Sequence, residues 1–116
     1  MYIHIKASGV DSTPAFQEYV NEKIGALAHF VDRWEERGSV AAWVEVVRTR
    51  HHRHGDVFTA VVDIRLPRKV LRAEQSAGDA RAAIDAARDV LKRELERYKE
   101  SRVEVLKRAR RRSREK

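Results

Sequence analysis

Cysteine is absent from this chain of 116 residues, and the sequence has only 2 prolines, 5 glycines and 7% aromatic residues. Without thiols the chain forms no disulfide and no thiolate metal site. It also lacks any apolar run near the roughly 18 residues that a membrane helix needs, and its first residues, "MYIHIKASG", lack the apolar core of a signal peptide. We therefore expect a soluble, cytoplasmic protein with no membrane partner.

Charge is the property that the sequence has in excess: 37% of the residues are charged, and the net charge is +7. Residues 1–47 carry 4 basic and 7 acidic side chains, residues 48–106 carry 14 and 10, and the last ten, "KRARRRSREK", carry 7 and 1. The tail therefore supplies most of the positive excess. Such a tail favours attraction to a polyanion such as nucleic acid, but it is also typical of disordered solubilising ends.

Periodic apolar positions predict a strand, a helix, three strands and a second helix, in that order. The first strand follows from the alternation in "YIHIK", and Thr13 with Pro14 is typical of the cap and first residue of a helix, which we expect to reach about Trp34. Strands are expected in "VAAWVEVV", "VFTAVVDIRL" and "VLRAE", with a turn at Pro67 before the last. The second helix is expected to begin near Asp79.

The expected architecture is α+β, with a four-stranded, mostly antiparallel sheet and two helices packed on one face. It buries the apolar stripe of the second helix, which comprises Ala80, Ile84, Ala87, Leu91, Leu95 and Tyr98. We expect one domain in residues 1–100, followed in residues 101–116 by a basic helical extension or a disordered tail. The other sheet face stays open; Tyr2, His4 and Trp43 there suit base stacking, although partial cover by loops is the preferred interpretation.

Four cations of the second helix, Arg81, Arg88, Lys92 and Lys99, follow one another at intervals of seven, four and seven residues. At about 100° per residue they fall within about 40° of one another, beside the buried stripe. A row of this kind can follow a phosphate backbone, and its binding then weakens as salt is added. The alternative is a solvated flank in which neighbouring carboxylates pair with the four cations.

Neither a catalytic nor a metal-binding arrangement is evident in the sequence. Residues 51–54, "HHRH", hold three imidazoles, but these are nearly adjacent and no carboxylate or cysteine stands at ligand spacing, so we expect an exposed basic loop. A glycine-rich phosphate loop, a nucleophile elbow and a pair of carboxylates in a pocket-forming pattern are all missing. We expect no enzymatic activity, no cofactor, no metal and no small-molecule substrate.

Two segments carry a family resemblance: "HIKASGVDSTPAFQEYVNEKIGALAHFVDR" and "AEQSAGDARAAIDAARDVLKRELERYK". The second closely resembles the hallmark of the ribosome hibernation-promoting factors, also called ribosome-associated inhibitor or sigma-54 modulation proteins. That hallmark reads approximately Ala-Glu, then Asp-Met-Tyr-Ala-Ala-Ile-Asp, then Lys-Leu-x-Arg-Gln-Leu-x-Lys-x-Lys. The resemblance covers about residues 2–100, implies the fold predicted above, and is to the short form, which lacks the additional C-terminal domain of long members.

The resemblance implies binding to the small ribosomal subunit, in the mRNA and tRNA channel between head and body, where the protein would block translation in stressed or stationary cells. Family members contact ribosomal RNA mostly through basic side chains of the two helices and the adjoining sheet. Lys23 matches a lysine of the first helix, and Arg93, Arg97 and Lys99 match basic positions of the second. With the helical strip and the tail added, the expected RNA-binding residues are Lys23, Arg81, Arg88, Lys92, Arg93, Arg97, Lys99, Arg108 and Arg111.

The sequence departs from the hallmark at several of its positions. Arg81 stands where tyrosine is usual, Val90 where lysine precedes leucine, and Glu94 where glutamine is usual. Ala26 also stands at a common lysine of the first helix. These changes weaken the expected grip on RNA, and the helical strip partly restores it. Two alternatives remain: an interaction protein that self-associates or binds a partner through its extended C-terminal helix, and general RNA binding by the arginine-rich tail.

Overall fold

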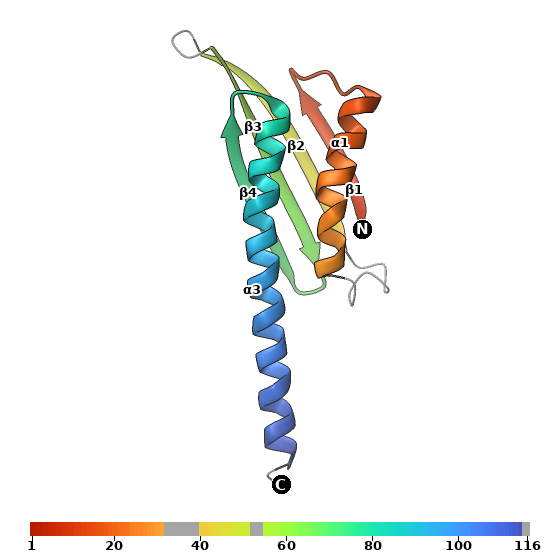
Figure 1. Cartoon of the computed structure of the whole chain (residues 1–116), viewed down its shortest axis with the longest axis vertical. Helices are drawn as coiled ribbons and strands as arrows, with labels where there is room; N and C mark the ends of the chain where they lie inside the picture. Colours follow the sequence, from red (N-terminus) through yellow and green to blue (C-terminus); the bar gives the residue numbers. More distant parts are fainter. Residues whose placement is uncertain (32–39, 52–54, 115–116) are drawn as a thin grey trace.

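The computed structural model describes residues 1–31, 40–51 and 55–114 (Figure 1). Within these residues the elements follow in the order β1 (Tyr2–Ser8), α1 (Pro14–Gly25), the 3₁₀ helix η1 (Ala26–Phe30), β2 (Ala41–His51), β3 (Gly55–Leu66), β4 (Lys69–Ala77) and α3 (Ala80–Arg114). The strands form one sheet in the order β1-β2-β3-β4, in which β1 and β2 are parallel and the other neighbours are antiparallel. The predicted α+β fold, with a mostly antiparallel four-stranded sheet, is therefore confirmed.

Both helices cover the same face of the sheet, and the core lies between the two layers (Figure 1). Alternate residues of the strands point into this core, because successive side chains of a strand leave it on opposite faces. The buried side chains of the strands are Ala42, Val44, Val46, Ala60, Val62, Ile64, Leu66, Leu71 and Ala73, and those of the helices are Phe16, Val20, Ile24, Leu27, Ala83, Ile84, Ala87, Leu91 and Leu95. Val31, directly after η1, and Val40, directly before β2, are buried as well. Each large side chain among them contributes roughly 1.5–3 kcal/mol by leaving water.

The predicted apolar stripe of the second helix is correct in its middle, but its first and last residues are not fully buried. Its four central residues are buried, whereas Ala80 and Tyr98 are only half-buried and pack against the edge of the core. Ala83, which the predicted stripe leaves out, is fully buried. At about 100° per residue it lies only about 40° from Ala87, so these two small side chains together let α3 approach the sheet closely.

Both helices begin with the caps that the sequence predicts. The Thr13 hydroxyl oxygen accepts a hydrogen bond from the Phe16 N–H over 3.1 Å, and Pro14 is the first residue of α1. At the start of α3, the Asp79 carboxylate accepts from the Ala82 N–H over 2.8 Å. Each cap satisfies a backbone donor that the first helical turn leaves without a partner.

The first helix is shorter than predicted. We expected it to reach about Trp34, but α1 ends at Gly25 and the chain continues as the 3₁₀ helix η1 as far as Phe30. Glycine is a weak helix former, and the α-helical pattern changes directly after it. Residues 32–39, where the predicted end falls, lie outside the described part of the chain.

The hairpin of β2 and β3 is longer than predicted. Arg48, Thr49 and Arg50, expected in a polar connection, belong to β2 and pair with residues 56–58 of β3. The carboxylate of Asp56 forms ion pairs with both arginines from across the hairpin, which makes polar residues compatible with a strand here. The expected histidine loop at residues 51–54 lies outside the described residues, apart from the backbone of His51.

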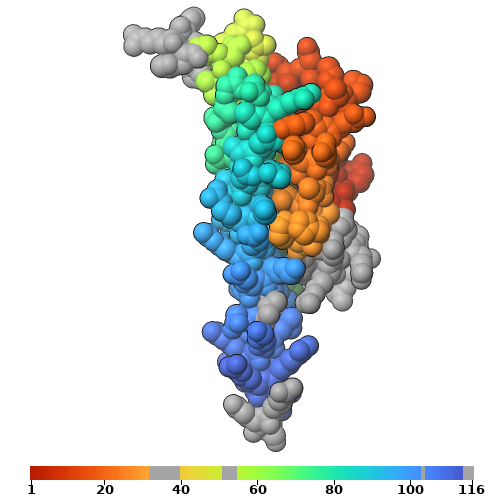
Figure 2. Space-filling view, viewed as in Figure 1, coloured from red at the N-terminus to blue at the C-terminus, as the bar shows by residue number. Residues whose placement is uncertain are grey.

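The C-terminal half of α3 projects beyond the sheet (Figure 1, Figure 2). As a result the molecule measures 66 Å along its longest axis, against 28 and 17 Å along the others. From Lys99 onward, every side chain of α3 that the structure describes is exposed. Across the described ranges, no helix is both long and apolar enough to cross a membrane.

Candidate functional site

The helical strip of Arg81, Arg88, Lys92 and Lys99 begins where α3 contacts α1. The guanidinium carbon of Arg81 lies 4.8 Å from the ring centroid of Tyr19, a residue of α1. Arg88, seven residues further along, is half-buried, and its side chain is 32% exposed. Lys92 and Lys99 are exposed, the latter at the start of the projecting half of α3. The strip therefore runs from the contact between the helices out to the free end of the molecule.

Tyr19 joins two of the predicted RNA-binding cations. Its hydroxyl donates a hydrogen bond to a carboxylate oxygen of Asp85 over 2.6 Å, which ties α1 to α3. Its ring centroid lies 5.6 Å from the Lys23 ammonium nitrogen and 4.8 Å from the Arg81 guanidinium carbon. Tyr19, Lys23, Arg81 and Asp85 are called the tyrosine cluster below. It brings a cation of each helix to one aromatic ring.

The tyrosine cluster also determines the protonation of its own hydroxyl. The hydrogen bond to Asp85, then burial, then the negative charge of Asp85 raise the pKa of Tyr19 to about 12, and the charge of Arg81 opposes this rise. Tyr19 therefore keeps its proton at neutral pH and continues to donate to Asp85. The spacing of the strip predicted Arg81 and the resemblance predicted Lys23, but neither pointed to Tyr19, because its partner Asp85 is 66 residues away. The spacing of Tyr19 and Lys23, one helical turn apart, was the only local signal.

Two predicted cations of α3 pair with carboxylates of the same helix. Arg88 Nη2 lies 2.9 Å from Asp89 Oδ1, and Arg97 Nη1 lies 3.7 Å from Glu94 Oε1. Both pairs are partly exposed, and pairs of this kind contribute about 0–1 kcal/mol. A phosphate can replace such a carboxylate at small cost. The solvated flank and the phosphate-binding row, which the sequence left open, are therefore both compatible with this helix.

Two further predicted residues, Lys92 and Arg93, line a shallow depression on α3 together with Asp89 and Glu96. All four side chains are exposed. Mixed charge of this kind makes the depression close to neutral. It therefore offers an anion less attraction than the cations alone would provide.

The predicted RNA-binding residues of α3 do not share one face. At about 100° per residue, Arg93 and Arg111 point about 120° away from the helical strip. Arg97 and Arg108 point about 160–180° away from it. Arg108 and Arg111 are exposed on the projecting half. The strip is thus one surface, and the remaining arginines surround the helix.

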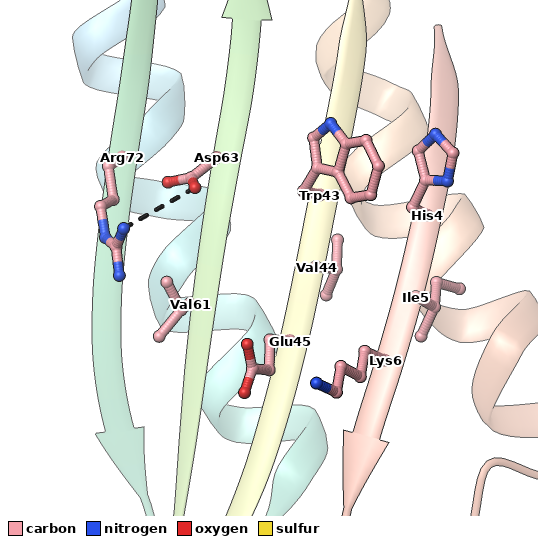
Figure 3. Close-up of a pocket in the computed structure, with 9 residues that line it drawn as sticks. All are labelled: His4, Ile5, Lys6, Trp43, Val44, Glu45, Val61, Asp63 and Arg72. Atoms are coloured by element: carbon pink, nitrogen blue, oxygen red, sulfur yellow. Dashed lines mark ion pairs between the residues drawn. The ribbon is translucent and has the colours of Figure 1, made fainter.

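The open face of the sheet carries a second cluster of rings, which Figure 3 shows in part. The rings of His4 and Trp43 stack at 3.8 Å with an angle of 5°, and the Tyr2 ring meets His4 edge-on at 4.4 Å. The Arg65 guanidinium carbon lies 4.8 Å from the Trp43 ring centroid. Tyr2 and Trp43 remain 67% and 41% exposed, so the expected cover by loops is not found in the described parts of the chain.

A metal site is not evident either. Among the residues that the structure describes, no group of three or more histidine, aspartate or glutamate side chains is arranged to hold a metal ion. The histidines of residues 52–54 lie outside that set.

A family model described as "Sigma 54 modulation protein / S30EA ribosomal protein" matches residues 3–103, and the chain belongs to this family. Two curated relatives are ribosome hibernation promotion factors. The one from Deinococcus radiodurans is 33% identical over 95 residues, which is 82% of this chain and 47% of the relative. The one from Lactococcus lactis subsp. cremoris is 32% identical over 98 residues, or 83% and 48%. The chain therefore spans about half the length of these relatives.

Solved structures share the same fold. The N-terminal domain of Protein Y from Thermus thermophilus is 27% identical and has a TM-score of 0.66, with 84% of this chain and 99% of that chain covered. A ribosomal subunit interface protein from Coxiella burnetii has a TM-score of 0.67 with 85% and 98% covered, but at 19% identity this likeness shows the fold alone. Together with the family match, these findings confirm the resemblance seen in the sequence and the prediction of a non-enzymatic protein.

Proposed function

We propose that the chain is a ribosome hibernation factor that binds the RNA of the small ribosomal subunit, in the mRNA and tRNA channel, and thereby inhibits translation. The observation that carries the proposal is the helical strip, together with the tyrosine cluster at its start. Membership of the family supports ribosome association as the setting. The curated relatives are named for ribosome hibernation, which supports the outcome.

The physical basis of the proposed binding is electrostatic. Each lysine or arginine that neutralises a phosphate releases condensed counterions, so the affinity falls steeply as salt rises. The strip offers Arg81, Arg88, Lys92 and Lys99 along one side of a rigid helix, which suits a row of phosphates. The tyrosine cluster adds Lys23 next to Arg81, because both cations lie against one ring. No bond is made or broken, and inhibition follows from occupying the channel.

Co-sedimentation with small ribosomal subunits at low and moderate salt tests this proposal. The informative variant is Lys92→Glu with Lys99→Glu, since both residues are exposed strip cations and the fold should persist. The matched control is Arg93→Glu with Arg97→Glu, which changes the charge of the same helix equally but on another side. We expect the strip variant to lose at least tenfold more affinity than the control. Equal losses, or a native chain that stays in the supernatant at both salt concentrations, would contradict the proposal.

The projecting half of α3 favours a second candidate function, self-association or binding of a partner protein. Val105 and Leu106 there are 52% and 45% exposed, although both are large apolar residues. Burying such side chains against another helix would be favourable. Light scattering decides between the two functions: a mass that falls to that of a monomer when residues 101–116 are removed supports self-association, and equal monomer masses exclude it.

A further inference from the structure

The open face of the sheet lies on the side away from the helical strip. Its aromatic rings and several of its cationic side chains lie together at one corner of this face. The strand register places His4, Trp43, Asp63 and Arg72 in one row across all strands. The neighbouring row, closer to the turn between β3 and β4, contains Arg65. Figure 3 shows the row from His4 to Arg72 on the side of the sheet away from the helices.

The planar groups of this corner lie in contact with one another. Trp43 lies against His4 at 3.8 Å between centroids, and the Arg65 guanidinium lies 4.8 Å from the Trp43 ring centroid. Tyr2 meets His4 edge-on, with 4.4 Å between centroids and 64° between the ring planes. The outer members remain accessible, because Tyr2 is 67% exposed and Arg65 is also exposed. A further planar group can therefore pack against Tyr2 or Arg65 without displacing any of these groups.

The same corner has an excess of positive charge. Residues 65–72 hold four basic and no acidic side chains, of which Lys69 lies on the helix side, 5.7 Å from the ring centroid of Tyr98. Arg65 and Arg72 stand on the open face, and Arg68 is exposed in the turn between them. Asp63 stands beside Arg72 and is paired with it at 3.8 Å, whereas Glu45 and Glu74 stand further from the turn, opposite Lys6 and Val61 in the strand register.

A depression of about 390 Å³ borders these groups, lined in part by Trp43, His4, Asp63 and Arg72. One oxygen of Asp63, Oδ1, is buried there and has no hydrogen-bond partner among the described residues. A carboxylate oxygen only accepts, and leaving it unpaired away from water costs free energy. Because Oδ1 is buried, a ligand in the depression would meet the side chains of Trp43, His4 and Arg72 instead.

We propose that this corner is a second RNA-binding surface, specific for unpaired nucleotides. Bases pack against Tyr2 and Arg65, and phosphates lie near Arg65, Arg68 and Arg72. Unpaired RNA combines the features needed, since it offers ring faces and regular negative charge. A second copy of the chain fits less well, because a symmetric contact would bring Arg65, Arg68 and Arg72 close to their own copies.

This inference goes beyond the proposed function, because the corner lies on the opposite face from the helices (Figure 1). The helical strip would grip RNA by charge alone, whereas the corner would hold unpaired bases by stacking. A bound chain could then contact RNA on both of its faces. Only the strip is needed for the proposed binding to the small subunit, so the two ideas can fail separately.

The test measures binding of the full chain to a labelled, unstructured oligoribonucleotide of about ten nucleotides, by fluorescence anisotropy. A duplex of similar length is the comparison. Trp43→Leu and Tyr2→Ala each remove a ring, and Tyr2 is so exposed that its replacement leaves the core unchanged. We expect either variant to bind the single strand about tenfold more weakly, which corresponds to the removal of one base stack. Binding of the duplex should stay within about twofold.

The control is the strip variant Lys92→Glu with Lys99→Glu, which should lose the small subunit and keep the ring-dependent part of single-strand binding. If Tyr2→Ala and Trp43→Leu, both folded by circular dichroism, bind the single strand like the native chain, the inference is overturned. It is also overturned if the native chain is a dimer that Trp43→Leu makes monomeric, since the open sheet face is then the dimer interface. Ribosome binding that fails while ring-dependent binding persists would remove the proposed function alone.

Discussion

Tyr19 determines how the two helices meet at the candidate RNA-binding surface. It donates its hydroxyl hydrogen to Asp85 across the helix contact, and its ring lies against both Lys23 and Arg81. The ring comes from α1 and the cation Arg81 from α3, so the contact joins the two helices. One residue thus links the stability of the helix pair to the placement of two proposed phosphate ligands.

Replacing Tyr19 with phenylalanine separates these two roles. Tyr19→Phe removes the donor to Asp85 but keeps the ring, so we expect the free energy of unfolding to fall by about 1–2 kcal/mol. Urea denaturation at neutral pH measures this loss. Tyr2→Phe is the matched control, because the Tyr2 hydroxyl has no hydrogen bond to any described residue, and it should change stability very little. A loss of equal size in both variants would show that the bond to Asp85 contributes nothing.

The pH dependence of stability provides a second check on Tyr19. Its pKa is about 12 in the folded chain, and an ordinary tyrosine, such as that of the unfolded chain, has a pKa of about 10. A raised pKa means that the folded state binds the proton more tightly, so the stabilisation is complete below pH about 10 and disappears as the pH rises towards about 12. The difference in stability between the native chain and Tyr19→Phe should therefore shrink between these pH values. A constant difference would contradict the raised pKa.

Among the elements, α3 combines three functions in one continuous helix. Its first half buries Ile84, Leu91 and Leu95 against the sheet, its flank carries the helical strip, and its second half projects with exposed cations. Because a helix is stiff and has a fixed rise per residue, the core under the first half determines the direction of the second. Anything that loosens the start of α3 would therefore also displace the strip.

Asp79 tests how strongly the start of α3 contributes. Its carboxylate accepts from the Ala82 N–H, so Asp79→Ala should lower the free energy of unfolding by about 1 kcal/mol. Asp79→Asn keeps an oxygen that can accept the same bond and should retain most of the stability. Thermal denaturation of both variants measures this. Equal stability of the alanine and asparagine variants would show that the cap is not formed.

The whole molecule is elongated and has two unlike ends, with a compact sheet and helix body at one and a bare basic helix at the other (Figure 2). The last ten residues hold 7 of the 25 basic side chains and only 1 acid. Positive charge is therefore concentrated at the C-terminal end of α3, whereas the body carries a more balanced charge. The proposed RNA-binding residues span both parts.

Removal of residues 107–116 separates these contributions. We expect the shortened chain to unfold at the same denaturant concentration, because the removed side chains that the structure describes are exposed and bury no core. Its affinity for the small subunit should fall, and the dependence of log K on log salt should become shallower by about 0.7–0.9 for each phosphate that the tail no longer neutralises. Co-sedimentation across a salt series gives both values. Complete loss of binding would favour general RNA attraction by the tail over binding by the body.

Local patterns were sufficient to predict most of the fold. Alternation identified which residues of each strand face the core, and Thr13 and Asp79 marked the starts of both helices. Two boundaries were wrong for different reasons. The apolar spacing continues past Gly25, so periodicity alone predicted a longer α1. Arg48 and Arg50 are polar, and their partner Asp56 lies on the other strand, so the local pattern predicted a loop.

The candidate site was less predictable than the fold. The four cations of the strip belong to one helix, so their spacing in the sequence was enough to predict that they share one side of α3. The sequence did not predict which cations pair with carboxylates. It also did not predict that Tyr19 contacts both Lys23 and Arg81. At the open sheet face, Tyr2, His4 and Trp43 were identified as neighbours, but their stacking order and the part played by Arg65 depend on the strand register.

By itself, the sequence determined the order of the elements, the face of each that is buried and the row of cations beside the buried stripe of α3, because these depend on periods of two or 3.6 residues that are written locally. Only the tertiary structure decided which groups from distant segments meet: Tyr19 with Asp85, Arg48 and Arg50 with Asp56, and Arg65 with Trp43. Those contacts depend on how the helices pack and how the strands align, and packing joins residues whose separation along the chain leaves no periodic trace.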